Sequence, residues 1–138
     1  MNIDSIQNGY VIDHIQAGSA MRLYHLLKLD DLDVSVAIIK NVTSQRLGKK
    51  DIIKIDADID LDTDVIGYVD PDATVNIIRN GELIEKRELH TPELLTNVIL
   101  CKNPRCITTT EQELPHIFRL VDRSQKLYRC LYCETKAK

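Results

Sequence analysis

The chain has 138 residues and a formal net charge of -3, and 43% of its residues are hydrophobic although only 4% are aromatic. This length allows one domain or two small ones, and the aliphatic side chains are sufficient for a core. No apolar run approaches the roughly 20 residues that a membrane span needs, and no signal peptide or lipidation motif is visible. We therefore expect a cytoplasmic protein that has no membrane partner.

The first part of the chain alternates between strand and helix patterns. Alternating β-branched and aromatic residues over 9–15 predict a strand, with Ile12 and His14 on one face and Ile15 on the other. Ser19 is the predicted N-cap of a helix whose apolar residues recur at helical spacing as far as Leu27. Two further strands are predicted, at 34–40 and 51–55.

An acidic stretch follows, in which aspartates alternate with other residues from Asp56 to Asp64. The spacing invites comparison with a calcium-binding loop, but such a loop needs glycine at its sixth position and glutamate at its twelfth. Counted from Asp56, these positions hold Leu61 and Gly67. We therefore interpret the stretch as a solvated edge or the start of a helix.

The next two strand-like runs, 73–79 and 82–87, are joined by Asn80 and Gly81. Both joining residues tolerate a positive φ, so the pair predicts a type I′ hairpin turn.

The chain changes character after this hairpin. Residues 91–93 are typical of a helix start or a linker, and residues 97–100 are typical of a strand. We predict an α+β chain with two domains, 1–92 and 97–138. The order of strands and helices favours a ferredoxin-like antiparallel sheet with helices on one face for the first domain, and a small C-terminal β domain after it.

All four cysteines lie in this C-terminal part, in two close pairs separated by 23 residues: Cys101 with Cys106, and Cys130 with Cys133. Short knuckle loops can aim two such pairs of thiolates at one tetrahedral point. Four sulfur ligands leave no open position for a substrate, so we predict one structural Zn²⁺ per chain, which binds a domain too small to build a core alone. Two disulfides are the alternative, which the lack of a visible secretory signal disfavours.

Charge also divides the chain. Residues 1–100 carry 10 basic and 17 acidic side chains, whereas residues 101–138 carry 8 and 4. The two parts are therefore -7 and +4, which indicates different partners. The basic part permits a zinc-ribbon nucleic-acid-binding protein as an alternative function. Against it, few aromatic residues there are available to stack on bases, namely Phe118, Tyr128 and Tyr132.

Motifs for catalysis are not visible in the sequence. The chain has no Walker-type loop and no dinucleotide-binding glycine motif, and its four histidines are scattered away from any nucleophile motif. Thiolates held on zinc are poor nucleophiles. We therefore predict a protein that is not an enzyme and has no catalytic residues.

Basic residues gather near the predicted strand ends. If the strands that carry them are neighbours, the ammonium groups would meet phosphates, while a carboxylate and an imidazole would meet a base or ribose. A small nucleotide site and ordinary solvated charges are both open from spacing. The residues concerned are Lys49, Lys50, Lys54, Lys86, Asp13 and His14.

Four separated stretches stand out in order along the chain: Val11–Ile15, Gly48–Ile55, Ala73–Ile77, and the cysteine pairs with Cys130–Glu134. Together with the cysteine spacing of 4, 23 and 2 residues, they make nearly the whole chain resemble the regulatory chain of aspartate carbamoyltransferase. The resemblance implies a chain without catalytic activity that takes part in pyrimidine biosynthesis. Its N-terminal allosteric domain would bind nucleotides, CTP as inhibitor and ATP as activator, and its zinc domain would grip the catalytic chain. Regulatory dimers would bridge two catalytic trimers, giving six catalytic and six regulatory chains.

The resemblance also implies roles for single residues. Asp13 and His14 would face the nucleotide, Lys54 would reach its base or ribose, and Lys86 would meet its phosphates. The apolar wall of this site would be Val11, Ile6 and Ile3. The segments that would face the catalytic chain contain Asn103, Tyr132 and Glu134.

Overall fold

The computed structural model of the chain describes residues 6–45 and 48–137. The chain divides into two compact units, Met1–His90 and Thr91–Lys138.

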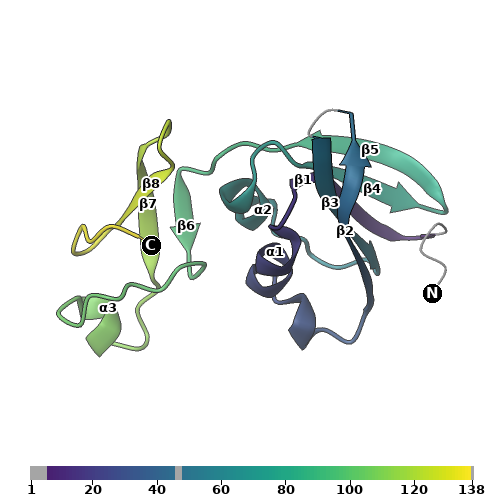
Figure 1. The fold of residues 1–138 in the computed structure, drawn as a ribbon. Coiled ribbons are helices and arrows are strands. Elements are labelled where there is room, and N and C mark those ends of the chain that lie inside the picture. The colour runs from purple at the N-terminus through teal and green to yellow at the C-terminus, as the bar shows by residue number, and fades with distance from the viewer. Residues whose placement is uncertain (1–5, 46–47, 138) are drawn as a thin grey trace. The chain divides into compact units, whose positions relative to one another are not determined.

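The first unit is a five-stranded antiparallel sheet with helices on one face (Figure 1). The strand order is β2-β3-β1-β4-β5, and the first four strands alternate with two helices as β-α-β-β-α-β. This is the ferredoxin-like arrangement with β5 added at one edge, so the predicted fold class is confirmed. The elements are β1 (Gly9–Gln16), α1 (Ala20–Leu26), a 3-10 turn (Leu29–Asp31), β2 (Ser35–Ser44), β3 (Gly48–Asp56), α2 (Thr63–Val69), β4 (Thr74–Arg79) and β5 (Glu82–Glu88).

The core of the first unit lies between the sheet and the two helices. Ile12 of β1 pairs with Ile53 of β3 and with Val75 of β4, and all three side chains are buried. Leu23 of α1 and Ile66 of α2 are fully buried as well. Because successive side chains of a strand point to opposite faces, the residues between these buried positions face away from the helices.

A bulge in β1 changes the predicted alternation. The pairing of β1 with β3 shifts between Ile12 and Ile15, and His14 has a φ of 58°. The extra residue returns Ile15 to the buried side, where its exposure is 0%. Our placement of Ile15 on the face opposite Ile12 was therefore wrong, because strict alternation does not survive a bulge.

The Asp51 carboxylate joins the segment that follows this bulge to a second bulge, in β2. This fully buried carboxylate accepts hydrogen bonds from the backbone amides of Gly18, Ala20 and Asn41, at 3.0, 3.2 and 2.8 Å. Ala20 is the first residue of α1, where backbone amides lack helical partners, and Gly18 lies in the turn just before its N-cap. The third lies in β2 at a second bulge, between Ile39 and Val42. Ser19 does occupy the N-cap position, but its side chain makes no capping bond in the described part of the chain.

The turns of the first unit follow from local chemistry. The acidic stretch ends as a helix start, because Asp62 is the N-cap of α2 and its side chain accepts from the amides of Asp64 and Val65. Asn80 and Gly81 have φ values of 54° and 77°, as a type I′ turn requires. Both predictions are confirmed.

The second unit is a three-stranded antiparallel sheet in the order β6-β7-β8 with one short helix. Leu95, Phe118 and Cys130 occupy one cross-strand row, and all are buried, so the small core packs directly against a cysteine. Residues 91–93 form the linker of the two predicted alternatives and not a helix start. The predicted strand at 97–100 was wrong, since the strand here is Leu94–Thr96. The elements are β6 (Leu94–Thr96), α3 (Ile107–Thr110), β7 (Ile117–Asp122) and β8 (Leu127–Cys130).

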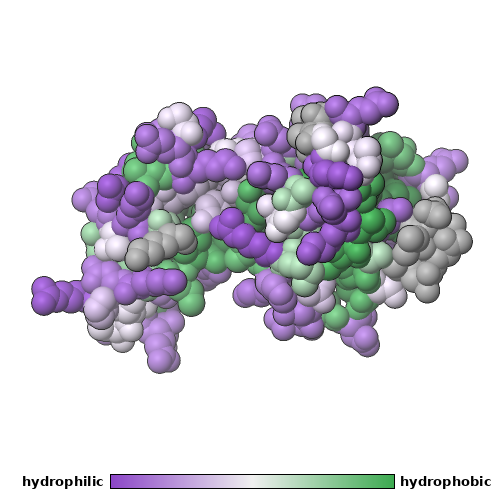
Figure 2. Space-filling view, viewed as in Figure 1, coloured by the Kyte–Doolittle hydropathy of each residue, from purple (hydrophilic) through white to green (hydrophobic). Residues whose placement is uncertain are grey.

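The surface of both units mixes polar and apolar residues. Figure 2 shows hydrophilic side chains over most of the visible face, with hydrophobic ones between them. Among the described residues, no helix has the length and apolar character needed to cross a membrane.

Candidate functional site

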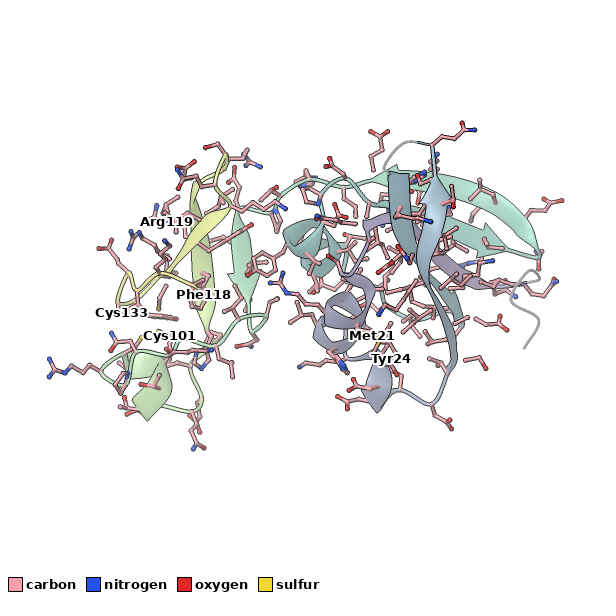
Figure 3. The ribbon with its side chains drawn as sticks, viewed as in Figure 1. Met21, Tyr24, Cys101, Phe118, Arg119 and Cys133 are labelled. Carbon is pink, nitrogen blue, oxygen red and sulfur yellow. The ribbon has the colours of Figure 1, made fainter. Side chains whose placement is uncertain are left out.

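The four cysteine sulfurs of the second unit form one cluster. All four Sγ atoms lie within 4.8 Å of one another, with 3.6 Å between Cys101 and Cys133 and 3.7 Å between Cys106 and Cys130. Figure 3 shows Cys101 and Cys133 side by side. A tetrahedral zinc ion with Zn–S bonds of about 2.3 Å separates its sulfur ligands by about 3.8 Å, so the donor set fits such an ion. The cysteines are free thiols, which removes the disulfide alternative.

Two tight loops aim the sulfurs at this point. In the first, the Asn103 side chain accepts from the amide of Arg105, and the Asn103 carbonyl accepts from the amide of Cys106. In the second, the amide of Glu134 donates to the carbonyl of Cys130, and Glu134 has a φ of 63°. Between them, the amide of Cys101 donates to Nδ1 of His116, at 3.0 Å. These backbone constraints hold the ligand positions.

The metal-free thiols differ in acidity. Burial raises the pKa of Cys101 to about 12, and burial also raises the pKa of Cys130. Burial would likewise raise the pKa of Cys133, but hydrogen bonds from Thr135, with the side chain of Asn103, outweigh it and lower that pKa to about 6. A metal ion that takes up four thiolates therefore displaces protons, so its affinity rises with pH.

A second group of candidate residues forms a row across the sheet of the first unit. Val11 of β1 pairs with Lys54 of β3 on one side and Asn76 of β4 on the other, and Asn76 pairs with Lys86 of β5. Directly paired residues share a face, and this face is the one away from the helices. Lys54 and Lys86 thus lie three strand spacings apart, about 14 Å.

Asp13 and His14 lie beside this row, at the bulge in β1. The Asp13 carboxylate pairs with the ammonium of Lys50 at 2.9 Å and accepts from the amide of His14 at 2.6 Å. Burial alone would raise the pKa of Asp13, but Lys50 and the His14 amide outweigh it and hold the pKa below its usual value. The His14 ring lies 3.1 Å from the hydroxyl of Thr74 and lines a polar cavity of about 240 Å³ with Gln16, Lys49, Asp70 and Asp72.

Comparison with known proteins decides the family. Residues 1–90 match the family model "Aspartate carbamoyltransferase regulatory chain, allosteric domain", and residues 93–138 match the corresponding "metal binding domain". The chain belongs to the family of aspartate carbamoyltransferase regulatory chains.

Curated relatives carry the same family name over nearly their full length. The regulatory chain of Clostridium botulinum (strain Hall) is 48% identical over 134 residues, which cover 97% of this chain and 92% of the relative. That of Bifidobacterium longum is 45% identical over 138 residues, covering 100% and 99%, and that of Clostridium tetani is 47% identical over 135 residues, covering 97% and 94%. Regulatory chains are non-catalytic subunits, so this chain is a regulatory chain and not an enzyme. Family membership favours this description over the zinc-ribbon nucleic-acid-binding alternative.

As a regulatory chain, this protein brings some of the predicted residues together and not others. Val11, Lys54 and Lys86 share one row, and Asp13 and His14 lie beside it. Ile6 is buried, with an exposure of 6%, and Ile3 lies outside the described residues.

Sequence reasoning missed Asn76, although it lies in one of the four stretches that carried the resemblance. Its Oδ1 atom is buried and has no hydrogen-bond partner among the described residues. The sequence did contain a signal, which is the alternation of the strand. Val75 and Ile77 are buried on the helix side, so Asn76 between them must point to the opposite face of the sheet, where Val11 lies.

The second unit carries a basic row that sequence spacing also did not reveal. Arg119 pairs directly with Arg129, and Arg129 pairs with Lys136. Like charges opposite each other on neighbouring strands destabilise a sheet. Three cationic side chains thus lie side by side on one face of the second unit.

Proposed function

We propose that this regulatory chain binds CTP as an inhibitor and ATP as an activator on the helix-free face of its first unit. It holds one structural Zn²⁺ through Cys101, Cys106, Cys130 and Cys133, and it passes the effector signal through the zinc unit to the catalytic chains of aspartate carbamoyltransferase. The pathway is pyrimidine biosynthesis, and the location is the cytoplasm, where thiols stay reduced.

The observation that carries the nucleotide site is the cross-strand row. Its two lysines are about 14 Å apart, a separation comparable with an extended nucleoside triphosphate, with the apolar side chain of Val11 between them. Lys86 is exposed and suits the phosphates, whereas half-buried Lys54 suits the base or ribose. Asp13 and His14 lie beside the row, close to Lys50. Ile6 is proposed for the apolar wall, together with Ile3, which lies outside the described residues.

Asn76 supports the same placement. A buried amide oxygen without a donor costs about 1–3 kcal/mol. A ribose hydroxyl or an exocyclic amino group, which cytosine and adenine both carry, would supply that donor. The unpartnered oxygen in the middle of the row thus favours a ligand with hydrogen-bond donors.

Docking to the catalytic chain is supported by charge. Residues 101–138 carry a net charge of +4, and Arg119, Arg129 and Lys136 gather part of it on one sheet face. An acidic patch on the catalytic chain is the complementary partner. The knuckle residues Asn103, Tyr132 and Glu134 border this unit's metal centre and are proposed to lie at the same interface.

A regulatory homodimer is supported by the edges of the first sheet. Of the two edge strands, β5 carries five charged residues in seven, whereas β2 carries one in ten. Charged side chains keep strand edges from pairing with other chains. We therefore assign β2 to the dimer contact, within an assembly of six catalytic and six regulatory chains.

The test separates the two lysines. Lys86→Ala should weaken CTP and ATP by similar factors, about tenfold, because it removes a charge-assisted bond to phosphates that both ligands share. Lys54→Ala should change the ratio of the two affinities, because the bases differ. Lys28→Ala, at an exposed position between α1 and the 3-10 turn and outside the row, is the matched control. Titration calorimetry on the zinc-loaded chain measures the affinities for CTP and ATP. Unchanged affinities in both Lys86→Ala and Lys54→Ala would contradict the proposed nucleotide site.

A further inference from the structure

Each knuckle of the metal centre places a threonine hydroxyl against a sulfur. In both pairs, the second cysteine is followed two residues later by a threonine, as Cys106-Ile-Thr108 and Cys133-Glu-Thr135. Thr108 Oγ1 lies 3.0 Å from Cys106 Sγ, and Thr135 Oγ1 lies 3.1 Å from Cys133 Sγ. The first cysteine of each pair is followed at the same distance by Asn103 or Tyr132 instead.

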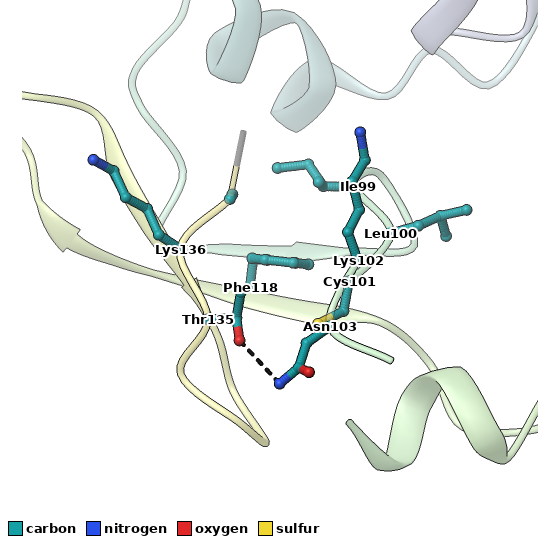
Figure 4. A pocket seen from close by; sticks show the side chains of 9 residues that line it. Ile99, Leu100, Cys101, Lys102, Asn103, Phe118, Thr135 and Lys136 are labelled. Carbon is teal, nitrogen blue, oxygen red and sulfur yellow. Dashed lines mark hydrogen bonds between the residues drawn. The ribbon is translucent and has the colours of Figure 1, made fainter. Parts of the chain in front are cut away.

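One of these hydroxyls is itself held by the opposite knuckle. The Asn103 side-chain amide donates to Thr135 Oγ1 at 3.2 Å, which the dashed line in Figure 4 marks. With its lone pair engaged by Asn103, the hydroxyl hydrogen of Thr135 is left for Cys133. Asn103, Thr135 and Cys133 thus form a hydrogen-bond chain that joins the first knuckle to a ligand of the second.

We propose that Thr135, oriented by Asn103, and Thr108 are positioning residues that donate hydrogen bonds to the metal-bound thiolates of Cys133 and Cys106 and so retain the zinc ion. A thiolate bound to a metal has no proton, so in each contact the hydroxyl is the group that donates. Four thiolates around Zn²⁺ leave a net charge of -2 on the centre, and each such bond spreads that charge outward.

Thr135 has the larger effect on release. Cys101, Cys106 and Cys130 are 5%, 1% and 1% exposed, whereas Cys133 is only half-buried. Water and chelators therefore reach Cys133 first, and its Zn–S bond is the first to open. The hydroxyl that stabilises this thiolate in place lies beside an open hollow lined by Asn103, Phe118 and Lys136. Within the cluster, Thr108 is buried, so it acts on a sulfur that opens later.

The experiment measures zinc release from the full chain into a coloured chelator. Thr135→Val, which keeps the shape and removes the hydroxyl, should release zinc about tenfold faster, and Thr135→Ser should restore the original rate. Thr96→Val, at an exposed position of β6, is the matched control and should not change the rate. Combining Asn103→Ala with Thr135→Val should raise the rate of zinc release little beyond that of Thr135→Val alone, because both substitutions act on Cys133. The effect of Thr108→Val on this rate should instead add to that of Thr135→Val.

A second readout excludes a merely structural role. In the cobalt-substituted chain, the sulfur-to-metal charge-transfer band should move to lower energy in Thr135→Val and return in Thr135→Ser, since a donor on the thiolate lowers its electron density. The inference rests on the proposed zinc centre, which the wild-type chain tests separately by binding one equivalent of metal. With that equivalent bound, a wild-type release rate or an unmoved band in Thr135→Val would overturn the role of Thr135.

Discussion

Removal of the metal should unfold the second unit and leave the first folded. A domain of roughly 50 residues has a net stability of about 2–7 kcal/mol, whereas a structural zinc ion contributes about 10–16 kcal/mol. The apolar core of this unit is small, and the buried row Leu95, Phe118, Cys130 ends on a metal ligand. The free energy contributed by the metal thus exceeds the whole net stability of the unit, so the small apolar core cannot keep the unit folded once the metal is removed.

Cys130→Ser removes one metal ligand by a single substitution. Cys130 is 1% exposed, and its amide donates to the carbonyl of Thr135, so this amide reports directly on whether the unit stays folded. Amide hydrogen exchange followed by mass spectrometry should show full loss of protection at Cys130 and Leu131, in the variant and in the chelator-treated wild type. Protection in β1 and β3 should persist, since their core belongs to the first unit. Thr96→Val should behave as the wild type does.

Retained amide protection in the metal-free protein would contradict this role of the metal. If the amides of Cys130 and Leu131 stay protected in metal-free protein, the apolar row alone folds the unit, and the metal is not its main source of stability. Simultaneous loss of protection in β1 and β3 would instead show that the two units do not fold independently.

Three further perturbations test the first unit. Asn76→Leu removes an unpartnered buried oxygen, so the effector-free unit should be at least as stable as before. The same substitution should lower the affinities for CTP and ATP in calorimetry, and unchanged affinities would contradict the role of Asn76. Asp51→Asn should lower the free energy of unfolding by about 3 kcal/mol in urea titrations, because three amides lose a charged acceptor. Asp60→Asn, at an exposed position, should cost little, and equal effects of the two substitutions would contradict the stabilising role of the Asp51 carboxylate. The Asp13 carboxylate has a pKa below 3.8 in the folded chain, so its stabilising effect is present above that value and is lost as pH falls through the folded pKa. In thermal unfolding across an acid pH series, Asp13→Asn should therefore show a smaller acid destabilisation than the wild type, and an identical pH dependence would contradict the pairing with Lys50.

Several features could be predicted because their causes are local. The hairpin at Asn80 and Gly81 follows from two residues that accept a positive φ, and the start of α2 follows from the capping carboxylate of Asp62. The alternation of strand and helix patterns likewise indicated the ferredoxin-like class before any pairing was known. Residues 91–100 show the opposite case, since a three-residue strand such as β6 is too short to produce a periodic signal.

The cysteine spacing predicted a four-thiolate metal site, because the number and type of donors dictate the coordination, and the four sulfurs do lie in one cluster. Tertiary structure decided which residues support the proposed effector site and the metal. Lys54, Val11, Asn76 and Lys86 become neighbours only through the strand order β3-β1-β4-β5. In the same way, the amides of Gly18 and Asn41 meet one carboxylate, that of Asp51, only in the folded chain. Periodicity records which face a residue occupies within its own strand. The neighbours that it meets across the sheet depend on how distant strands pair, and that information is not local to any stretch of the sequence.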